Sequence, residues 1–294
     1  MTCSRCGAVE DRAANRLGHC RNCHNTLLGQ IQTRASNIAQ NVCYWMEKAE
    51  LNHLQKIFYS DEAEDLTDLK QYASNGRAEG FVSEGKTFNK RHGWASSAAV
   101  RAFIDGGMTI CECEGLTHAV FFNALLDVVT LPVFDLMFQD VTIGLGCTIK
   151  VLMDNRNIMD DSGVTRGDWV YILNKDRGFF TDTVQDSRQG AAGGGWNLVC
   201  TQSAPIHYYM GFGLNAPGQT QAATLDTIRD KMLDIKKKPK EETKHKKRGS
   251  VDLGKKTMGF EDTGLNSFIR LQWHKRFNAN KIMIAVTAAL TPTD

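Results

Sequence analysis

The sequence lacks the long apolar segments that direct a chain to or across a membrane. Its first residues, MTCSRCGAVEDR, have no apolar core of the kind that a secretory signal peptide carries. No run of about 18 consecutive apolar residues occurs, so we expect no membrane-spanning helix and no membrane partner. The sequence therefore predicts a cytoplasmic protein, and any secretion would use a route that reads no cleavable N-terminal signal.

A strong charge of one sign is also missing. The 35 Lys and Arg residues nearly balance the 33 Asp and Glu residues, which leaves a formal net charge of +2 over 294 residues. That charge is too small to indicate binding of nucleic acid by the whole chain, and basic residues do not alternate with aromatic ones as they do on many such surfaces. We therefore expect no nucleic-acid partner.

Nine cysteines are present, and the first four form two CxxC pairs with thirteen residues between the pairs. A disulfide framework is not expected in a chain of this length without a secretory signal. Two closely spaced thiolate pairs can instead hold one tetrahedral ion, and a closed four-sulfur site is structural. We predict a structural zinc ion held by Cys3, Cys6, Cys20 and Cys23.

The chain divides into five segments by composition. Apolar residues at helical spacing and no proline mark 28–60, whereas 61–95 is polar and rich in loops. The basic stretch 236-KKKPKEETKHKKR-248 has no large apolar side chain and is expected to be a flexible linker. The predicted boundaries are 1–27 for the zinc knuckle, 28–95 for a helical connector, 96–235 for the main domain, 236–260 for the linker and 261–294 for a C-terminal segment packing on that domain through a strand at 281–290.

One stretch, 109-TICECEGLTHAVFFNALLDVV-129, combines two cysteines with the start of an apolar helix. From Gly115 onward the apolar residues recur at helical spacing, which places Cys113 at or just before the first turn. Unpaired N–H groups and the positive end of the helix dipole lower the pKa of a cysteine at this position. Cys113 is therefore the candidate nucleophile, with Cys111 as support or spectator. The alternative is two buried structural thiols, because cysteine is often buried.

A cysteine nucleophile needs a base that a third group orients. Strand-like runs follow the helix, at 148–153, 169–173, 197–201 and 206–214. His207 lies in the last of these runs and is the candidate base, with Asn197 as the group that orients its imidazole. His118, on the predicted helix itself, is the rival base.

These motifs resemble those of papain-like thiol enzymes of the NlpC/P60 type. A closer resemblance is to the bacterial protein-glutamine gamma-glutamyltransferases of the kind found in Bacillus spores. It rests on Glu112 directly before Cys113, on the apolar helix, and on 167-GDWVYILN-174, 196-WNLV-199 and 211-GFGL-214. Two positions depart from that family: Trp196 stands where its functional glutamate is expected, and Met210 where its histidine is expected.

The resemblance implies an α+β fold in which a helix-start cysteine packs on a small antiparallel sheet. It also implies cysteine-dependent acyl transfer on a protein glutamine, either transglutamination or deamidation, with Glu112 shaping the site. The protein would then be a bacterial effector or toxin, with a glutamine-bearing protein as substrate and an immunity or chaperone protein as a further partner. The alternatives are a peptidoglycan amidase or peptidase, and a non-enzymatic binding module that contains zinc.

Overall fold

The chain folds into both helices and antiparallel strands. The structure is a computed structural model that describes residues 21–49, 78–84, 87–106, 109, 111, 113–158, 160–174, 195–211, 223–228 and 269–291. The helices are α1 (Arg21–Ala49), α4 (Ser96–Asp105), α5 (Cys113–Val129), α6 (Leu131–Met137), the 3-10 helix η3 (Thr148–Leu152) and α9 (Ala279–Leu290). The strands are β1 (Phe81–Glu84), β2 (Thr87–Lys90), β3 (Thr142–Ile143), β4 (Met153–Asn157), β5 (Trp169–Asn174), β6 (Gly195–Gln202), β7 (Tyr208–Met210) and β8 (Ile269–Phe277).

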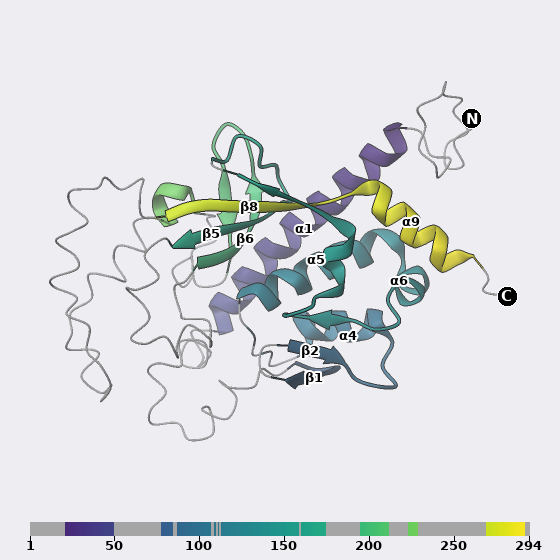
Figure 1. Cartoon of the computed structure of the whole chain (residues 1–294). Coiled ribbons are helices and arrows are strands. Elements are labelled where there is room, and N and C mark those ends of the chain that lie inside the picture. The colour runs from purple at the N-terminus through teal and green to yellow at the C-terminus, as the bar shows by residue number, and fades with distance from the viewer. Residues whose placement is uncertain are drawn as a thin grey trace, which may run out of the picture.

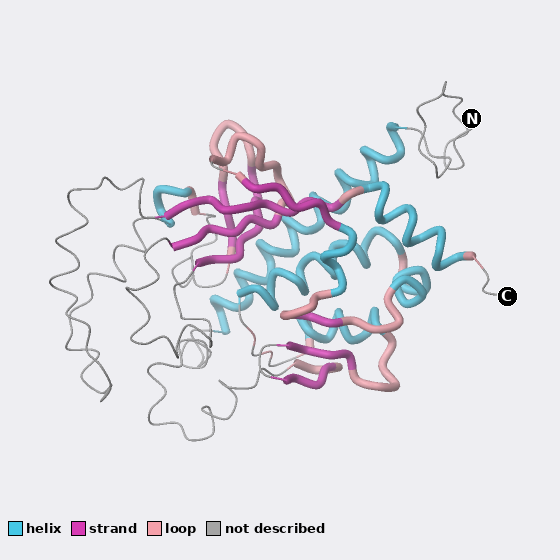
Figure 2. The backbone as a smooth tube through the Cα atoms, in the orientation of Figure 1, coloured by secondary structure: helices cyan, strands magenta, loops and turns pink. Residues whose placement is uncertain are grey.

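The strands form two sheets with antiparallel pairing throughout. The larger sheet has the order β4-β8-β5-β6-β7, and the smaller has the order β1-β2-β3. Strand β8 comes from the C-terminal part of the chain, yet it lies between β4 and β5 (Figure 1). Figure 2 shows the two sheets, in magenta, with helices between them. The main sheet is therefore assembled from segments more than a hundred residues apart.

Helix α5 is the central element of the larger core. Every residue from Gly115 to Leu126 is buried, because α5 contacts α1, α4 and the main sheet. The Phe121 ring meets the rings of Trp169 on β5 and Phe277 on β8. A helix that is apolar on all sides is expected to be enclosed in this way. The burial fixes the position of the start of α5, where Cys113 lies.

The two faces of the main sheet pack against different groups of residues. Successive side chains of a strand point to opposite faces. On β6, Val199 joins the core cluster that contains α1 and α5, whereas Leu198 and Cys200 join a second cluster on the other face. That second cluster also contains Val164 and Tyr209. This division decides which candidate side chains can meet.

Several predicted elements are confirmed, and two are wrong. The helix within 28–60 is confirmed as far as Ala49, the helix after Gly115 is α5, and the runs at 169–173 and 197–201 are β5 and β6. The predicted strand at 148–153 is mostly the 3-10 helix η3, in which Ile149 and Leu152, three positions apart, are both buried. The polar segment 61–95, expected to be rich in loops, contains β1 and β2 in its described part.

The predicted strand at 281–290 is also wrong, because these residues belong to α9. The side chain of Asn278 caps this helix by accepting a hydrogen bond from the Lys281 backbone N–H at 3.1 Å. Ile282 is buried, and Met283 and Val286 pack against the same core at helical spacing. The C-terminal segment does contribute a strand to the sheet, but that strand is β8, which precedes the apolar run. No helix of the described residues is long and apolar enough to cross a membrane.

Gly167, the first residue of the GD motif, allows α1 to approach the start of β5. Its φ is +85°, and a Cβ at this position would overlap the backbone of Gln32 on α1. Its backbone N–H donates to the Cys200 carbonyl oxygen at 2.6 Å. The motif glycine is therefore explained by a left-handed backbone together with a close helix–strand contact.

We predict that Gly167→Ala lowers the free energy of unfolding by about 2–4 kcal/mol, which combines left-handed strain with overpacking against Gln32. Gly93→Ala is the matched control, because Gly93 has a φ of +83° but nothing within 4 Å of its Cβ position. The control should lose only about 1 kcal/mol. Urea denaturation of both variants measures the difference, and equal losses would show that the contact with α1 contributes nothing.

Candidate active site

The start of α5 places Cys113 where the sequence predicted it. Cys113 is the first residue of the helix, so unpaired backbone N–H groups surround it. Cys111 is buried two residues earlier, against Gly115. Glu112 lies outside the described residues. The backbone geometry therefore matches that expected for a cysteine at a helix N-terminus.

Glu114 and His118 follow Cys113 on α5 and lie one helical turn apart. The Glu114 carboxylate accepts a hydrogen bond from Lys150 Nζ of η3 at 2.8 Å. The same Oε1 atom lies 3.5 Å from His118 Nε2. The Glu114 side chain is 39% exposed and that of His118 is fully buried. Glu114 thus bridges the solvent-facing Lys150 and the enclosed His118.

The His118 ring accepts a hydrogen bond at one nitrogen, and its other nitrogen has no hydrogen-bond partner among the described residues. Its Nδ1 accepts from the Gly144 backbone N–H at 3.0 Å, so the proton of the neutral ring resides on Nε2. Burial, followed by the nearby charges of Lys150 and Lys275, holds the pKa of His118 well below its usual value. Among the buried side-chain nitrogen and oxygen atoms of the described residues, only Nε2 has no hydrogen-bond partner. A neutral ring with an unsatisfied N–H is poorly suited to be a base.

Trp169 connects His118 to the sheet. The two rings meet edge to face, with their centroids 4.8 Å apart. Trp169 Nε1 donates to the Asn197 side-chain oxygen at 2.9 Å. Lys275 Nζ lies 4.3 Å from the Trp169 ring centroid and 4.2 Å from that of Trp273. The candidate orienting residue Asn197 therefore orients an indole rather than an imidazole.

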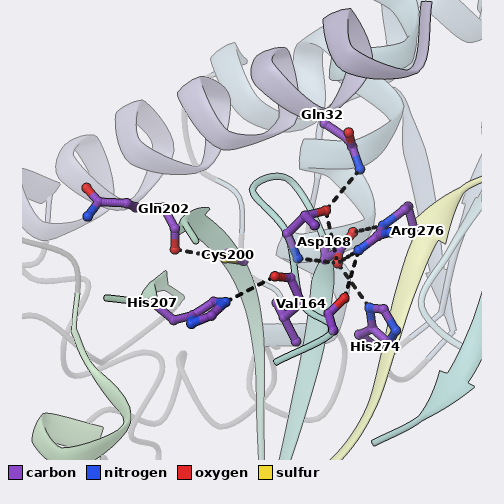
Figure 3. Close-up of polar contacts among 10 residues, drawn as sticks. Gln32, Val164, Asp168, Cys200, Gln202, His207, His274 and Arg276 are labelled. Atoms are coloured by element: carbon purple, nitrogen blue, oxygen red, sulfur yellow. Dashed lines mark hydrogen bonds and ion pairs between the residues drawn. The ribbon is translucent and has the colours of Figure 1, made fainter. Parts of the chain in front are cut away.

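His207 lies beside Val164 (Figure 3), on the face of the sheet that carries the second core cluster and not on the face covered by α5. Its Nε2 faces the Val164 carbonyl oxygen at 3.0 Å, and its Nδ1 lies 3.3 Å from an Asp161 carboxylate oxygen. The ring also stacks on Tyr209, which belongs to the second core cluster. Asn197 contacts Trp169 on the α5 side, so the structure does not bring His207 and Asn197 together.

The carboxylate of Asp168, the second residue of the GD motif, is the most enclosed charge of this region (Figure 3). It accepts hydrogen bonds from Arg276 Nε at 2.7 Å and Nη2 at 2.6 Å, and from the Thr165 backbone N–H at 2.8 Å. The His274 Nδ1 atom lies 3.0 Å away. Burial raises the pKa of Asp168, but the hydrogen bonds from Arg276 and His274 outweigh it, so the net pKa is lowered. Asp168 therefore holds β5 and β8 together as a carboxylate.

Burial keeps two other cysteines of the described residues in the unreactive thiol form. Burial raises the pKa of Cys147 and of Cys200 to about 12 in each case. Cys147 precedes η3 and is close enough to feel the charges of Lys150, Glu114 and Lys275, whereas Cys200 faces the second cluster. Neither thiol is a candidate nucleophile at neutral pH.

Sequence reasoning missed Lys150, Lys275 and Trp169 as members of this site. The two lysines are separated by more than a hundred residues in the sequence, and in the fold both ammonium groups lie over the Trp169 ring. The run 271-LQWHKRF-277, in which Lys275 stands two residues from both Trp273 and Phe277, is a signal that would have indicated a lysine held against aromatic rings.

The predicted zinc site lies almost entirely outside the described residues. Cys23 is in the first turn of α1, whereas Cys3, Cys6 and Cys20 are not described. Within the described ranges, no group of three or more His, Cys, Asp or Glu residues is placed to hold a metal ion. The zinc knuckle stays a prediction from the sequence.

Comparison with known proteins bears on the fold. No protein-family profile and no curated protein sequence matches the chain. Among solved structures, a transglutaminase from Geobacillus stearothermophilus, without its C-terminal extension, matches with a TM-score of 0.52 at 13% identity. The match covers 89% of this chain and 96% of that chain. The mixed helix and antiparallel-sheet fold is therefore transglutaminase-like.

We predict that Asp168→Asn lowers the free energy of unfolding at pH 7 by roughly 2–4 kcal/mol, because Arg276 loses its buried counter-charge and His274 loses a charged hydrogen-bond partner. Since the folded-state pKa of Asp168 lies below its unfolded value, the carboxylate stabilises the fold above about pH 4. This stabilisation is lost as the pH falls through the folded-state pKa, so the difference between wild type and variant should shrink in acid. Urea denaturation between pH 7 and pH 3 measures it.

The control is Asp160→Asn. Asp160 lies near Asp168 in sequence and its pKa is also lowered, by hydrogen bonds from Ser162, but it is exposed. This variant should change the free energy of unfolding much less. A pH-independent difference for Asp168→Asn would contradict the assigned role of its charge.

Proposed function

We propose that the protein is a cysteine-dependent acyltransferase that acts on glutamine side chains of other proteins, by transglutamination or deamidation. The observation that carries the proposal is the placement of Cys113 at the N-terminus of a buried helix that packs on an antiparallel sheet, within a transglutaminase-like fold. The family's glutamate and histidine positions carry Trp196 and Met210 here, so the sheet does not supply a base at those positions.

The proposed reaction has two steps. The Cys113 thiolate attacks the carboxamide carbon, the C–N bond breaks, and ammonia leaves with a proton from the site, which gives a thioester. Water then attacks the thioester and yields a glutamate, or a lysine amine attacks it and yields an isopeptide bond. Either step returns the thiol. The N–H groups of the first turn of α5 would stabilise the oxyanion that forms in both steps.

The surroundings of Cys113 support a thiolate without a histidine base. The helix N-terminus favours the anion, and Lys150 and Lys275 both lie close to Glu114, the residue after Cys113. His207 contacts Asp161 and Val164 on the other face, so we assign it no part in this reaction. Glu112 remains the candidate for shaping the site from the other side of Cys113.

We predict that limiting iodoacetamide at pH 6 modifies Cys113 before the other described cysteines, because burial holds the pKa of Cys147 and Cys200 at about 12. Cys113→Ala should lower ammonia release from a glutamine-containing peptide by about a thousandfold or more. Mass spectrometry reads the labelling, and Cys200→Ala is the control that should keep the activity. Slow, equal labelling of all cysteines would contradict an activated thiolate.

An effector role would add a cellular consequence to this chemistry. A protein that modifies glutamines in another bacterium should slow growth when it is produced in a bacterial cytosol, and the effect should vanish with Cys113→Ala. Harmless expression, with no Cys113-dependent modification in the extract, would remove the effector role and leave the enzymatic proposal to the peptide assay.

A structural zinc ion at Cys3, Cys6, Cys20 and Cys23 remains part of the proposal, on the spacing of the two cysteine pairs. We expect about one zinc ion per chain by elemental mass spectrometry, since four thiolates close one tetrahedral site. A Cys3→Ser and Cys20→Ser double variant should lose the metal, whereas Cys43→Ser should keep it. Equal zinc content in all three proteins would place the metal elsewhere or show binding to be adventitious.

A further inference from the structure

The residues around Glu114 offer more cationic and donor groups than acceptors. Lys150 and Lys275 both lie over the Trp169 ring, with Nζ 5.4 Å and 4.3 Å from its centroid. His118 adds a buried Nε2–H that no acceptor satisfies. The Glu114 carboxylate is the anion that these groups share in the structure, within hydrogen-bond reach of Lys150 and 3.5 Å from His118.

Lys275 is the cation of this cluster that has no counter-charge among the described residues. Within the described ranges, no carboxylate lies in ion-pair distance of its Nζ, which instead rests against two tryptophan rings. Burial and the charge of Lys150 lower the pKa of Lys275, and the charge of Glu114 opposes this effect. A further anion would relieve the repulsion between the two ammonium groups.

The cluster is also reachable. The side chains of Glu114 and Lys150 are 39% and 30% exposed, and Lys275 is half-buried. Glu114 directly follows Cys113, so the cluster begins within about 4 Å of the Cα atom of the nucleophile. A substrate that presents its carboxamide to Cys113 can therefore place a neighbouring side chain in this cluster.

We propose that Lys150, Lys275 and the His118 Nε2–H form a carboxylate site beside Cys113, which Glu114 fills when no substrate is bound. The inference rests on the proposed function and deepens it, because it makes the preferred acyl donor a glutamine with an acidic neighbour. A carboxylate is the chemical class that fits, since the chain's own carboxylate already occupies the position between Lys150 and His118. The γ-carboxylate of a glutamate product is the second source of the same group.

The test measures binding to the full chain carrying Cys113→Ala, by isothermal titration calorimetry at low salt. Three neutral-ended peptides are compared: acetyl-Glu-Gln-Glu-amide, acetyl-Ala-Gln-Ala-amide and acetyl-Ala-Glu-Ala-amide. The first should bind about tenfold more tightly than the second, as expected for charge-assisted contacts. Tight binding of the third peptide as well would assign the site to the product carboxylate. Equal affinity of all three peptides would overturn the carboxylate site.

Variants locate the site. Lys275→Gln should abolish the preference for the acidic peptide, and His118→Phe, which keeps a ring against Trp169, should reduce it. Should His118→Phe fail to fold, the Lys275 variant alone decides. Lys281→Gln is the control, because Lys281 pairs with Asp154 away from this cluster and should keep the preference. An unchanged preference in Lys275→Gln would refute the assignment.

The two proposals fail separately. A wild-type protein that shows Cys113-dependent ammonia release without any preference for acidic peptides keeps the proposed function and loses the carboxylate site. A protein that prefers the acidic peptide but releases no ammonia keeps the site and loses the function.

Discussion

The buried contact between Asp168 and Arg276 holds the arrangement on which the rest of the structure depends. A carboxylate with no exposure is tolerated only when hydrogen bonds replace its water, and here Arg276, His274 and the Thr165 backbone do so. The contact secures the beginning of β5 against β8. Trp169 follows directly, and its position determines where His118, Asn197 and Lys275 meet. A charge pair outside the site thus sets the geometry inside it.

The elements that were predicted correctly are those whose local pattern of apolar residues matches the side chains that they bury. The apolar residues after Gly115 indicated α5, and the strand predicted after the GD motif is β5. The run 281–290 was misjudged because its apolar residues fit a strand as well as a helix, and the Asn278 cap decides for the helix. Strand β8 was not predicted. Its basic residues are explained only by their contacts with distant parts of the chain, which are Trp169 for Lys275 and Asp168 for Arg276.

In the site, too, features set by neighbouring residues could be predicted from the sequence, whereas contacts between distant residues could not. Cys113 at a helix start is a local feature and could be found from the sequence. The predicted pairing of His207 with Asn197 does not occur, because strand parity puts their side chains on opposite faces, and the irregularity between Cys200 and Gln202 does not bring them together. Lys150 and Lys275 become neighbours through the fold alone. The sequence therefore predicted the helix start that carries Cys113 but not the groups packed around that helix.

The position of β8 has a consequence for how the protein is made. Strands β4 and β5 each pair with β8 and not with each other, so both keep an open edge until residues 269–277 have left the ribosome. The Arg276 partner of Asp168 arrives with the same segment. A chain still in synthesis can build α5 and present Cys113, yet it cannot complete the sheet behind it. Assembly of the main sheet therefore waits until β8 has been made, and a chain terminated before residue 269 is left with an incomplete sheet.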